Sequence, residues 1–404
     1  MTNLAMMQRF FPDAEYSNRW ERVHAEMARR DLDIAVVWGR TVGTYERSGD
    51  IVYLANYTSG NSGQIPAGLL GEACDGVGFS AVILERGEKP ELIADEEPYP
   101  HLIATDRYRW SYYPFPELVK ALKERPGASR VGFVGTDFIP MRYWEQLKEG
   151  LPGVEWVFCD DLVLAARVIK SPRELEAYRI AGKSSTAALT ALMDALQNGA
   201  SEAEAASQAA KEIVAAGGWP HYTPVNTNAR NIQSIYSRPM PGFSDRVPKK
   251  GDLSVAWVYG NTFEGYWLDP GRTFAIGDQP DEGQRELIDA TAAIVNECMK
   301  LCTPGRCIDE IIALGESMTR AFEEKAGGHS NIQDKWPLFG HGVGMMWEPP
   351  TLSSHYDGEF RTVEENMVMS TEAFLYHPEV GVAGFENNFI ITADGPELLT
   401  DAPM

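Results

Sequence analysis

The segment Lys249–Phe274, KKGDLSVAWVYGNTFEGYWLDPGRTF, contains two strand patterns that lead to a single aspartate. Leu253–Tyr259 and Phe263–Leu268 are rich in apolar, β-branched and aromatic residues, a composition that favours strands. Asp269 directly follows the second pattern and precedes a Pro-Gly pair. A carboxylate beside apolar strand residues is costly to bury unless it is paired or binds a cation. Asp269 is therefore a candidate ligand, with a solvated strand end as the alternative.

Three further residues lie in similar surroundings. His341 is flanked by glycines in FGHGVG, and glycine lets the backbone approach another group closely. Glu372 ends the strand pattern MVMSTE, and Glu386, in GFENNFII, precedes another strand pattern. One histidine and three carboxylates together suit a zinc ion or a harder divalent cation. For each residue alone, the alternative is a solvated strand end or a glycine-rich turn.

Helices with clear start signals surround these strand patterns. Ser171–Glu174 is a capping box with proline at the first helical position, so a helix begins there and runs to about Leu196. Ser201-x-x-Glu204 opens a second helix, and a Gly-Gly pair at 217–218 ends it. The remaining elements predicted for this half are helices over Gly283–Cys302 and Ile308–Glu323, and strands over Met367–Glu372 and Glu386–Thr392.

The first 165 residues alternate between helix and strand patterns, which is typical of a small α/β domain. Helices are predicted over Trp20–Arg29 and Met141–Leu147, and strands over Ile34–Trp38, Phe79–Leu84, Val131–Val134 and Val154–Phe158. Two stretches between them, Ser59–Gly78 and Arg107–Phe115, are predicted to be loops. We place a boundary near residues 160–171 and predict two domains, 1–165 and 166–404.

The composition restricts the partners. Lysine and arginine total 36 against 58 aspartate and glutamate residues, giving a net charge of −22, which repels phosphate backbones and anionic lipids. We therefore expect a small-molecule substrate, with neither nucleic acid nor a membrane as a partner. No apolar run approaches the length of about 18 residues needed to span a membrane, and the N-terminus lacks a signal-peptide pattern. Five cysteines favour a reducing compartment, so a cytoplasmic location is predicted.

Four ordered motifs resemble the creatinase, prolidase and methionine aminopeptidase family, whose catalytic domain has the pita-bread fold. They are the helix start Arg167–Ala181, the hairpin Lys249–Phe274, the segment Gly340–Gly344, and the segment Ser370–Glu386, which has a glutamate pair 14 positions apart. The resemblance covers about residues 165–404, and the first domain is similar to the creatinase/prolidase branch. It implies an α+β fold class, with an N-terminal α/β creatinase-like domain and a C-terminal pita-bread catalytic domain. It also implies a homodimer.

The resemblance implies that the metal ligands are Asp269, His341, Glu372 and Glu386, and that the catalytic residues are His341, Glu372 and Glu386. Family peptidases hold two metals with two aspartates, one histidine and two glutamates. The first aspartate falls here at Trp257 or Val258, and neither side chain can bind a metal. We therefore expect one divalent ion (Mn, Fe, Zn or Co). The alternative is no metal, with His341 and Glu372 as a creatinase-like acid/base pair.

The residues expected around the substrate depart from the family pattern. Trp347 stands where a substrate-side histidine is expected, Asn231–Met240 contains no second histidine, and Gly384 replaces an arginine. The substrate-binding candidates are the aromatic residues Trp347, Trp257 and Tyr259 (with Tyr266 and Trp267 beside them), the loop residues Arg230 and Arg238, and His377. Core packing is the alternative for each aromatic residue, and solvent exposure for each arginine. From the resemblance, the aromatic stretch 107–115 is expected to cover the pocket of a partner subunit.

These departures lead us to expect a hydrolase that cleaves a C–N bond, amide or amidine, of a small non-peptide or modified amino-acid substrate. One alternative is a metallopeptidase of the Xaa-Pro dipeptidase or aminopeptidase type. Another is a lyase, because His341-Gly-Val-Gly and Glu372-Ala373 are similar to the dimethylsulfoniopropionate lyase branch. A non-catalytic binding protein is the last alternative, although four retained ligand-like residues argue against it.

Overall fold

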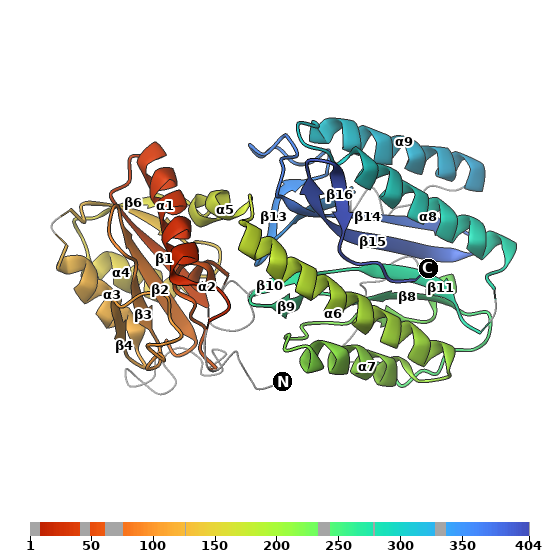
Figure 1. Cartoon of the computed structure of the whole chain (residues 1–404), viewed down its shortest axis with the longest axis horizontal. Coiled ribbons are helices and arrows are strands. Elements are labelled where there is room, and N and C mark those ends of the chain that lie inside the picture. Colours follow the sequence, from red (N-terminus) through yellow and green to blue (C-terminus); the bar gives the residue numbers. More distant parts are fainter. Residues whose placement is uncertain are drawn as a thin grey trace. The chain divides into compact units, whose positions relative to one another are not determined.

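The chain divides into two units, Met1–Arg167 and Val168–Met404 (Figure 1). The computed structural model describes residues 9–40, 49–60, 76–125, 127–232, 243–277, 279–327 and 337–403. Each unit combines helices with a sheet, so the mixed fold class expected from the sequence is confirmed. No helix in the described ranges is long and apolar enough to cross a membrane.

The first unit is built on a six-stranded sheet in the order β4-β3-β2-β1-β5-β6. Central β1 pairs antiparallel with β2 and parallel with β5, and buried Val36, Ile83 and Phe133 belong to the core that α3 and α4 complete. The strands are β1 (Ile34–Arg40), β2 (Phe79–Glu85), β3 (Glu91–Ala94), β4 (Tyr108–Trp110), β5 (Arg130–Val134) and β6 (Glu155–Phe158). The helices are α1 (Asp13–Arg29), α2 (Gly49–Ala55), α3 (Pro114–Lys123), α4 (Met141–Gly150) and α5 (Leu162–Arg167).

The helices and strands predicted for this unit are confirmed, but one predicted loop is wrong. Arg107–Phe115 contains β4 and the first turn of α3. Pro114 takes a position in the first turn of this helix, where the missing N–H has no cost, so the aromatic stretch passes directly from strand to helix. Of the other predicted loop, Ser59–Gly78, residues 61–75 lie outside the described part of the chain.

The second unit is built on an eight-stranded sheet in which β13, β12, β14, β15, β11, β8 and β7 lie in this order and β16 pairs with β15. The strands are β7 (Val225–Asn226), β8 (Leu253–Trp257), β11 (Gly271–Ala275), β12 (Gly340–Val343), β13 (Trp347–Thr351), β14 (Val368–His377), β15 (Gly381–Thr392) and β16 (Gly395–Leu398). The helices are α6 (Pro172–Gln197), α7 (Glu202–Ala215), the short 3-10 helix η4 (Ala229–Asn231), α8 (Glu282–Leu301) and α9 (Ile308–Ala326).

Both predicted capping boxes are confirmed. The Ser171 hydroxyl accepts the Glu174 N–H while the Glu174 carboxylate accepts the Ser171 N–H, and Ser201 and Glu204 repeat the pattern at α7. A third box, which the sequence analysis did not identify, opens α8 at Asp281. Such reciprocal bonds satisfy N–H groups that the first helical turn leaves without partners.

The strand predicted over Phe263–Leu268 is instead part of a hairpin. β9 (Asn261–Phe263) and β10 (Tyr266–Leu268) pair antiparallel, and the chain reverses between them at Glu264 and Gly265, both with positive φ, 53° and 88°. A Glu-Gly pair is a weak turn signal, because glycine tolerates this conformation but glutamate rarely adopts it. The reversal pairs Leu268 with Asn261 at the end of this hairpin, directly before Asp269.

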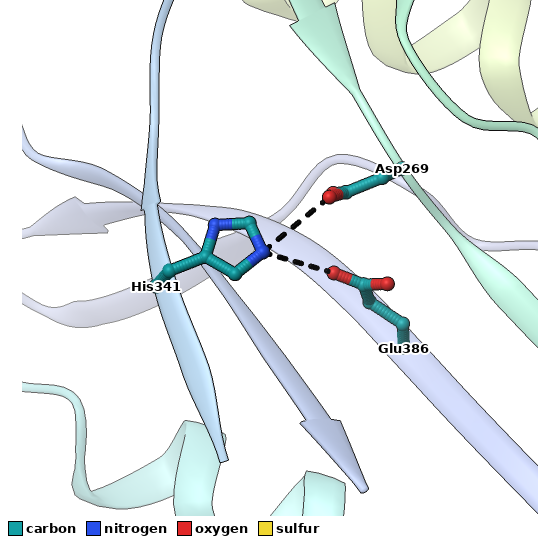
Figure 2. Close-up of side chains that lie close together, drawn as sticks. All are labelled: Asp269, His341 and Glu386. Atoms are coloured by element: carbon teal, nitrogen blue, oxygen red, sulfur yellow. Dashed lines mark ion pairs between the residues drawn. The ribbon is translucent and has the colours of Figure 1, made fainter. Parts of the chain in front are cut away.

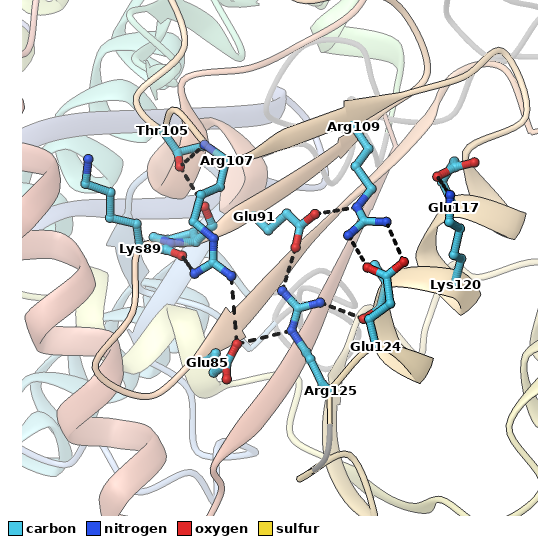
Figure 3. Close-up of polar contacts among 12 residues, drawn as sticks. Glu85, Lys89, Glu91, Thr105, Arg107, Arg109, Glu117, Lys120, Glu124 and Arg125 are labelled. Atoms are coloured by element: carbon cyan, nitrogen blue, oxygen red, sulfur yellow. Dashed lines mark hydrogen bonds and ion pairs between the residues drawn. The ribbon is translucent and has the colours of Figure 1, made fainter.

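A network of arginines and glutamates lies along β3 and the edge strand β4 of the first unit (Figure 3). The Glu91 carboxylate accepts hydrogen bonds from Arg109 Nε and Arg125 Nη2, each at 2.5 Å. Arg109 also binds Glu124 on the C-terminal side of α3 through two nitrogens. Burial raises the pKa of Glu91, but the two arginines lower it by more, so the net shift is downward.

Glu91→Gln is expected to lower the free energy of unfolding by about 1.5–3 kcal/mol at pH 7, the usual value of a hydrogen bond to a charged group. Because the folded-state pKa of Glu91 lies below the unfolded one, its contribution is complete above about pH 4.3 and is lost as the pH falls through the folded value. Urea unfolding at pH 7 and pH 3.5 measures the loss of stability and its dependence on pH. Exposed Glu88→Gln is the control. If Glu91→Gln lost the same amount of stability at both pH values, this account would be contradicted.

Candidate metal centre

Four neighbouring segments of the second sheet carry the four predicted ligands. His341 lies on β12, Glu372 on β14 and Glu386 on β15, and Asp269 directly follows β10 and lies two residues before β11. In the sheet these strands follow one another in the order β12, β14, β15 and β11. Residues that are up to 117 positions apart in the sequence are therefore adjacent in space, and all four are at least 97% buried.

The two glutamates face each other directly across the β14–β15 pair, in register. The preceding pair, Thr371 and Asn387, points to the opposite side, where both residues hydrogen-bond to α8. Since side chains alternate between the faces of a strand, Glu372 and Glu386 point away from α8. Two like charges directly opposite each other destabilise a sheet unless a cation or a proton lies between them.

The three carboxylate side chains converge on the imidazole of His341, and Figure 2 shows two of them, Asp269 and Glu386. Its Nε2 atom lies 3.4 Å from Asp269 Oδ2, 3.6 Å from Glu372 Oε1 and 3.7 Å from Glu386 Oε1. One ligand atom each from Asp269, His341 and Glu386 lies within 4.8 Å of the other two. This spacing matches the distance between ligands around one cation, since each would lie about 2.0–2.2 Å from the ion.

In each of Asp269, His341 and Glu386, the hydrogen bonds leave one side-chain nitrogen or oxygen atom available to bind a metal. His341 Nδ1 faces the carbonyl of Gly342 at 3.0 Å; a carbonyl only accepts, so Nδ1 carries the proton and Nε2 is the ligand atom. Within the described part of the chain, Asp269 Oδ2, His341 Nε2 and Glu386 Oε1 are buried and have no hydrogen-bond partner. Buried polar atoms without partners are rare in proteins, and a metal ion would satisfy all three.

The electrostatics also favour a cation. Burial, followed by repulsion from Asp269 and Glu372, raises the pKa of Glu386 well above its ordinary value, against the opposing effect of the Trp257 N–H. Burial lowers the pKa of His341, but Asp269 and Glu372 raise it, and the net shift is upward. The metal-free cluster therefore holds protons that a divalent ion would replace.

The structure distinguishes the two positions at which the missing aspartate was expected. The Trp257 side chain faces the cluster, where its indole Nε1 donates a hydrogen bond to Glu386 Oε2 at 2.7 Å. Val258 belongs instead to a separate apolar cluster with Leu189 and Ile213 of α6 and α7. An indole thus stands at the position from which a carboxylate would reach the cluster.

The predicted aromatic residues take different places. Trp347, which is half-buried, stacks on His341 with ring centres 4.3 Å apart and planes inclined at 26°. Trp267 lies 6.3 Å from His341, and half-buried Tyr259 packs on Trp267 at 5.8 Å. Tyr266 is buried and donates to Glu174, so it fixes α6 to the hairpin. Trp347 is the aromatic residue that contacts a predicted ligand from a half-exposed position.

The other predicted substrate residues are not brought to the cluster. Arg230, on η4, is exposed and pairs with Asp281 at the start of α8. His377 lies at the far end of β14, beside the turn to β15, where its Nδ1 accepts the N–H of Glu379. Arg238 lies outside the described residues.

Sequence reasoning missed Asn388, which holds Asp269 in place. The Asn388 side-chain nitrogen donates to Asp269 Oδ1 at 2.6 Å, and its side-chain oxygen accepts the Asp269 N–H at 3.1 Å. Asn388 lies two positions after Glu386 on β15, so both side chains point to the same face. A polar residue two positions after Glu386, within an apolar strand pattern, was the signal from which Asn388 could have been identified.

Two further buried groups support the strands around the cluster. The Arg272 guanidinium donates hydrogen bonds to four backbone carbonyls, those of Gly271, Glu386, Thr400 and Ala402. It therefore fixes β11, β15 and the C-terminal segment to one another, and burial lowers its pKa to about 10. Lys170 forms a buried ion pair with Glu348 at 2.6 Å. Since Glu348 follows Trp347, this pair fixes the strand that carries the stacked indole.

Two protein families match the chain. Residues 176–393 match metallopeptidase family M24, and residues 19–169 match the creatinase/prolidase N-terminal domain. An uncharacterised hydrolase/peptidase of Sinorhizobium fredii is 26% identical, over 97% of this chain and 96% of its own length. An Xaa-Pro dipeptidase of Pyrococcus horikoshii is 25% identical, over 79% of this chain and 86% of its own length.

Solved structures share the fold. The prolidase of Pyrococcus horikoshii superposes with a TM-score of 0.72 at 18% identity, over 95% of this chain and 98% of that structure. An Xaa-Pro dipeptidase of Bacillus anthracis gives a TM-score of 0.73 at 20% identity, over 96% and 98%. At these identities the similarity establishes the architecture, and the expected creatinase/prolidase fold is confirmed.

Lys170→Met is expected to lower the free energy of unfolding by about 3–5 kcal/mol, because it leaves the Glu348 carboxylate buried without its cation. Urea unfolding measures the loss, and exposed Lys183→Met on α6 is the matched control. Replacing both partners, Lys170→Met with Glu348→Leu, should recover much of the stability. A double variant less stable than Lys170→Met would contradict the explanation.

Proposed function

This chain belongs to metallopeptidase family M24, and we propose that it hydrolyses small dipeptides, of the Xaa-Pro type, with a divalent metal ion. The relatives named above include an Xaa-Pro dipeptidase, which favours the peptidase alternative over the non-peptide substrate expected from the sequence. The observation that carries the proposal is the convergence of three buried atoms without hydrogen-bond partners, Asp269 Oδ2, His341 Nε2 and Glu386 Oε1, within the described residues.

These three residues are proposed to hold the ion. Two carboxylate oxygens and one imidazole nitrogen suit Mn²⁺, Fe²⁺, Co²⁺ or Zn²⁺ and disfavour ions that prefer thiolate ligands. The thiols of Cys298 and Cys302 take no part, since both are buried in the core beside α8 and burial raises the pKa of each. When bound, the ion polarises a substrate carbonyl and lowers the pKa of a water molecule.

We assign to Glu372 the role of proton acceptor. Its Oε1 lies 3.6 Å from His341 Nε2, next to the three ligand atoms that lie closest together. A carboxylate beside the reacting water accepts its proton and can pass it to the leaving amine, a contribution of typically 10²–10⁴-fold. Asp269, His341 and Glu386 supply the three ligand atoms that lie closest together, so we assign proton transfer to Glu372, the remaining carboxylate of the four.

Trp347 supports a substrate with a ring or an apolar side chain. One of its faces lies against His341, and the residue is half-exposed beside the cluster. An indole at that place offers apolar contact to the pyrrolidine ring of a proline residue. Arg230 is paired with Asp281, so we do not assign to it the binding of the dipeptide carboxylate.

Purification without chelator is expected to give protein with bound metal, measured by elemental mass spectrometry, and Asp269→Ala should lose most of it. Exposed Asp289→Ala is the matched control and should keep the wild-type amount. Metal-free protein in the wild type, after incubation with Mn²⁺, Co²⁺ and Zn²⁺ in turn, would overturn the metal-dependent mechanism. It would favour His341 and Glu372 as a metal-free acid/base pair.

The metal-loaded protein is expected to release proline from Xaa-Pro dipeptides. A colorimetric proline assay measures the rate of this release. Glu372→Gln should lower kcat by at least about 10²-fold because it removes the proton acceptor, whereas exposed Glu379→Gln should leave kcat unchanged. Loaded protein that cleaves no Xaa-Pro dipeptide would contradict the dipeptidase. Turnover of other amides would then indicate a non-peptide hydrolase, an unsaturated product a lyase, and binding without turnover a binding protein.

A further inference from the structure

We propose that Trp257 and Asn388 restrict the centre to a single metal ion, by occupying the second oxygen of two ligand carboxylates. The inference rests on the proposed function, because it assumes that the cluster binds a metal. It concerns how many ions are bound and which side chains set that number. Trp257 and Asn388 act here as positioning residues, through Glu386 and Asp269.

Trp257 occupies one oxygen of Glu386. The indole Nε1 donates to Glu386 Oε2 at 2.7 Å, and both side chains are buried. An indole N–H is a neutral donor that can neither accept a hydrogen bond nor bind a cation. The bond therefore leaves Oε1 as the oxygen of Glu386 that is directed to His341.

The indole fits a recess formed by two glycines. A Cβ atom at Gly271, on β11, would lie 1.8 Å from Cε2 of Trp257, and a Cβ atom at Gly384, on β15, would lie 2.4 Å from Cη2. Phe374 stacks on the indole, with ring centres 5.4 Å apart and planes inclined at 27°. The ring is thus held between two strands by contacts that no other residue than glycine would permit at these positions.

Asn388 occupies one oxygen of Asp269 in the same manner. Its amide donates to Asp269 Oδ1 and accepts the Asp269 N–H, while its own backbone N–H donates to the Thr400 hydroxyl. Both side chains are fully buried. The two-point contact fixes the carboxylate plane and leaves Oδ2 directed to His341.

The consequence concerns bridging. In a two-metal site the ions lie about 3.5–4 Å apart, and a carboxylate that gives one oxygen to each ion can join them across that distance. In both Asp269 and Glu386 the second oxygen already accepts a hydrogen bond from a buried neutral donor, so a second ion would have to approach each carboxylate on the side where Trp257 or Asn388 lies, and bridging is disfavoured. The three remaining ligand atoms lie within 4.8 Å of one another, which suits one ion.

The test counts ions in the full-length protein. Isothermal titration with Mn²⁺ and elemental analysis should give one ion per chain in the wild type, and the paramagnetic resonance spectrum should be that of an isolated ion. Trp257→Asp removes the indole and supplies a carboxylate, so it should bind two ions and show a coupled pair. Trp257→Phe should bind one, because it supplies no carboxylate for a second ion and Asn388 still holds one oxygen of Asp269.

The outcomes are separable. Two ions in the wild type would overturn the inference and leave the dipeptidase proposal intact, whereas no ion would contradict the dipeptidase proposal itself. A folded Trp257→Asp variant, checked by circular dichroism, that still binds one ion would show that Trp257 does not set the number.

A second measurement decides the matter if Trp257→Asp does not fold. In Zn²⁺-loaded wild-type protein, the indole N–H signal of Trp257, assigned by its loss in Trp257→Phe, should exchange with solvent at least about 100-fold more slowly than that of exposed Trp219. Exchange at the rate of Trp219 would mean that Glu386 Oε2 is released when metal binds, and would overturn the inference.

Discussion

The repulsion between Glu372 and Glu386, buried and directly opposite each other across β14 and β15, is the constraint on which the second unit depends. Two ionised carboxylates at that separation cannot persist in a region of low dielectric without a compensating charge. The compensating groups lie on one face of the sheet only, where His341 and Asp269 converge on the two glutamates. On the opposite face, the neighbouring pair Thr371 and Asn387 binds α8. The sheet thus separates a polar, charged face from the face that packs on the helices.

Around this cluster, neutral hydrogen-bonding groups fix the orientation of the charged groups. The Trp257 indole and the Asn388 amide each take one carboxylate oxygen, and the Gly342 carbonyl fixes the imidazole. Neutral donors orient a carboxylate without cancelling the negative charge that attracts a cation. The charged supports lie one layer further out: Arg272 binds backbone carbonyls, and Lys170 is paired with Glu348.

The sequence was sufficient for the parts of the structure that rest on local signals. Capping boxes located the starts of α6 and α7, and apolar periodicity located the long helices and the central strands. The four cluster residues were identifiable because charged groups are rare beside apolar strand residues, and they do lie together, although Glu372 and Glu386 lie inside β14 and β15 and not at the strand ends that the sequence predicted. Which of Trp257 and Val258 faces the cluster was not decidable, because a shift of one residue reverses the face of a strand. Asn388 was missed for a related reason, since its value depends on a partner 119 positions away.

The recess that holds Trp257 has an implication for how such a chain can change over generations. With the indole present, any side chain at Gly271 or Gly384 would overlap it, so the three positions cannot vary independently. A lineage that gains the tryptophan must already have both glycines. A lineage that loses the tryptophan must replace it before it replaces either glycine. The order of substitutions is thus constrained by volume alone, and the three positions should be inherited as a group.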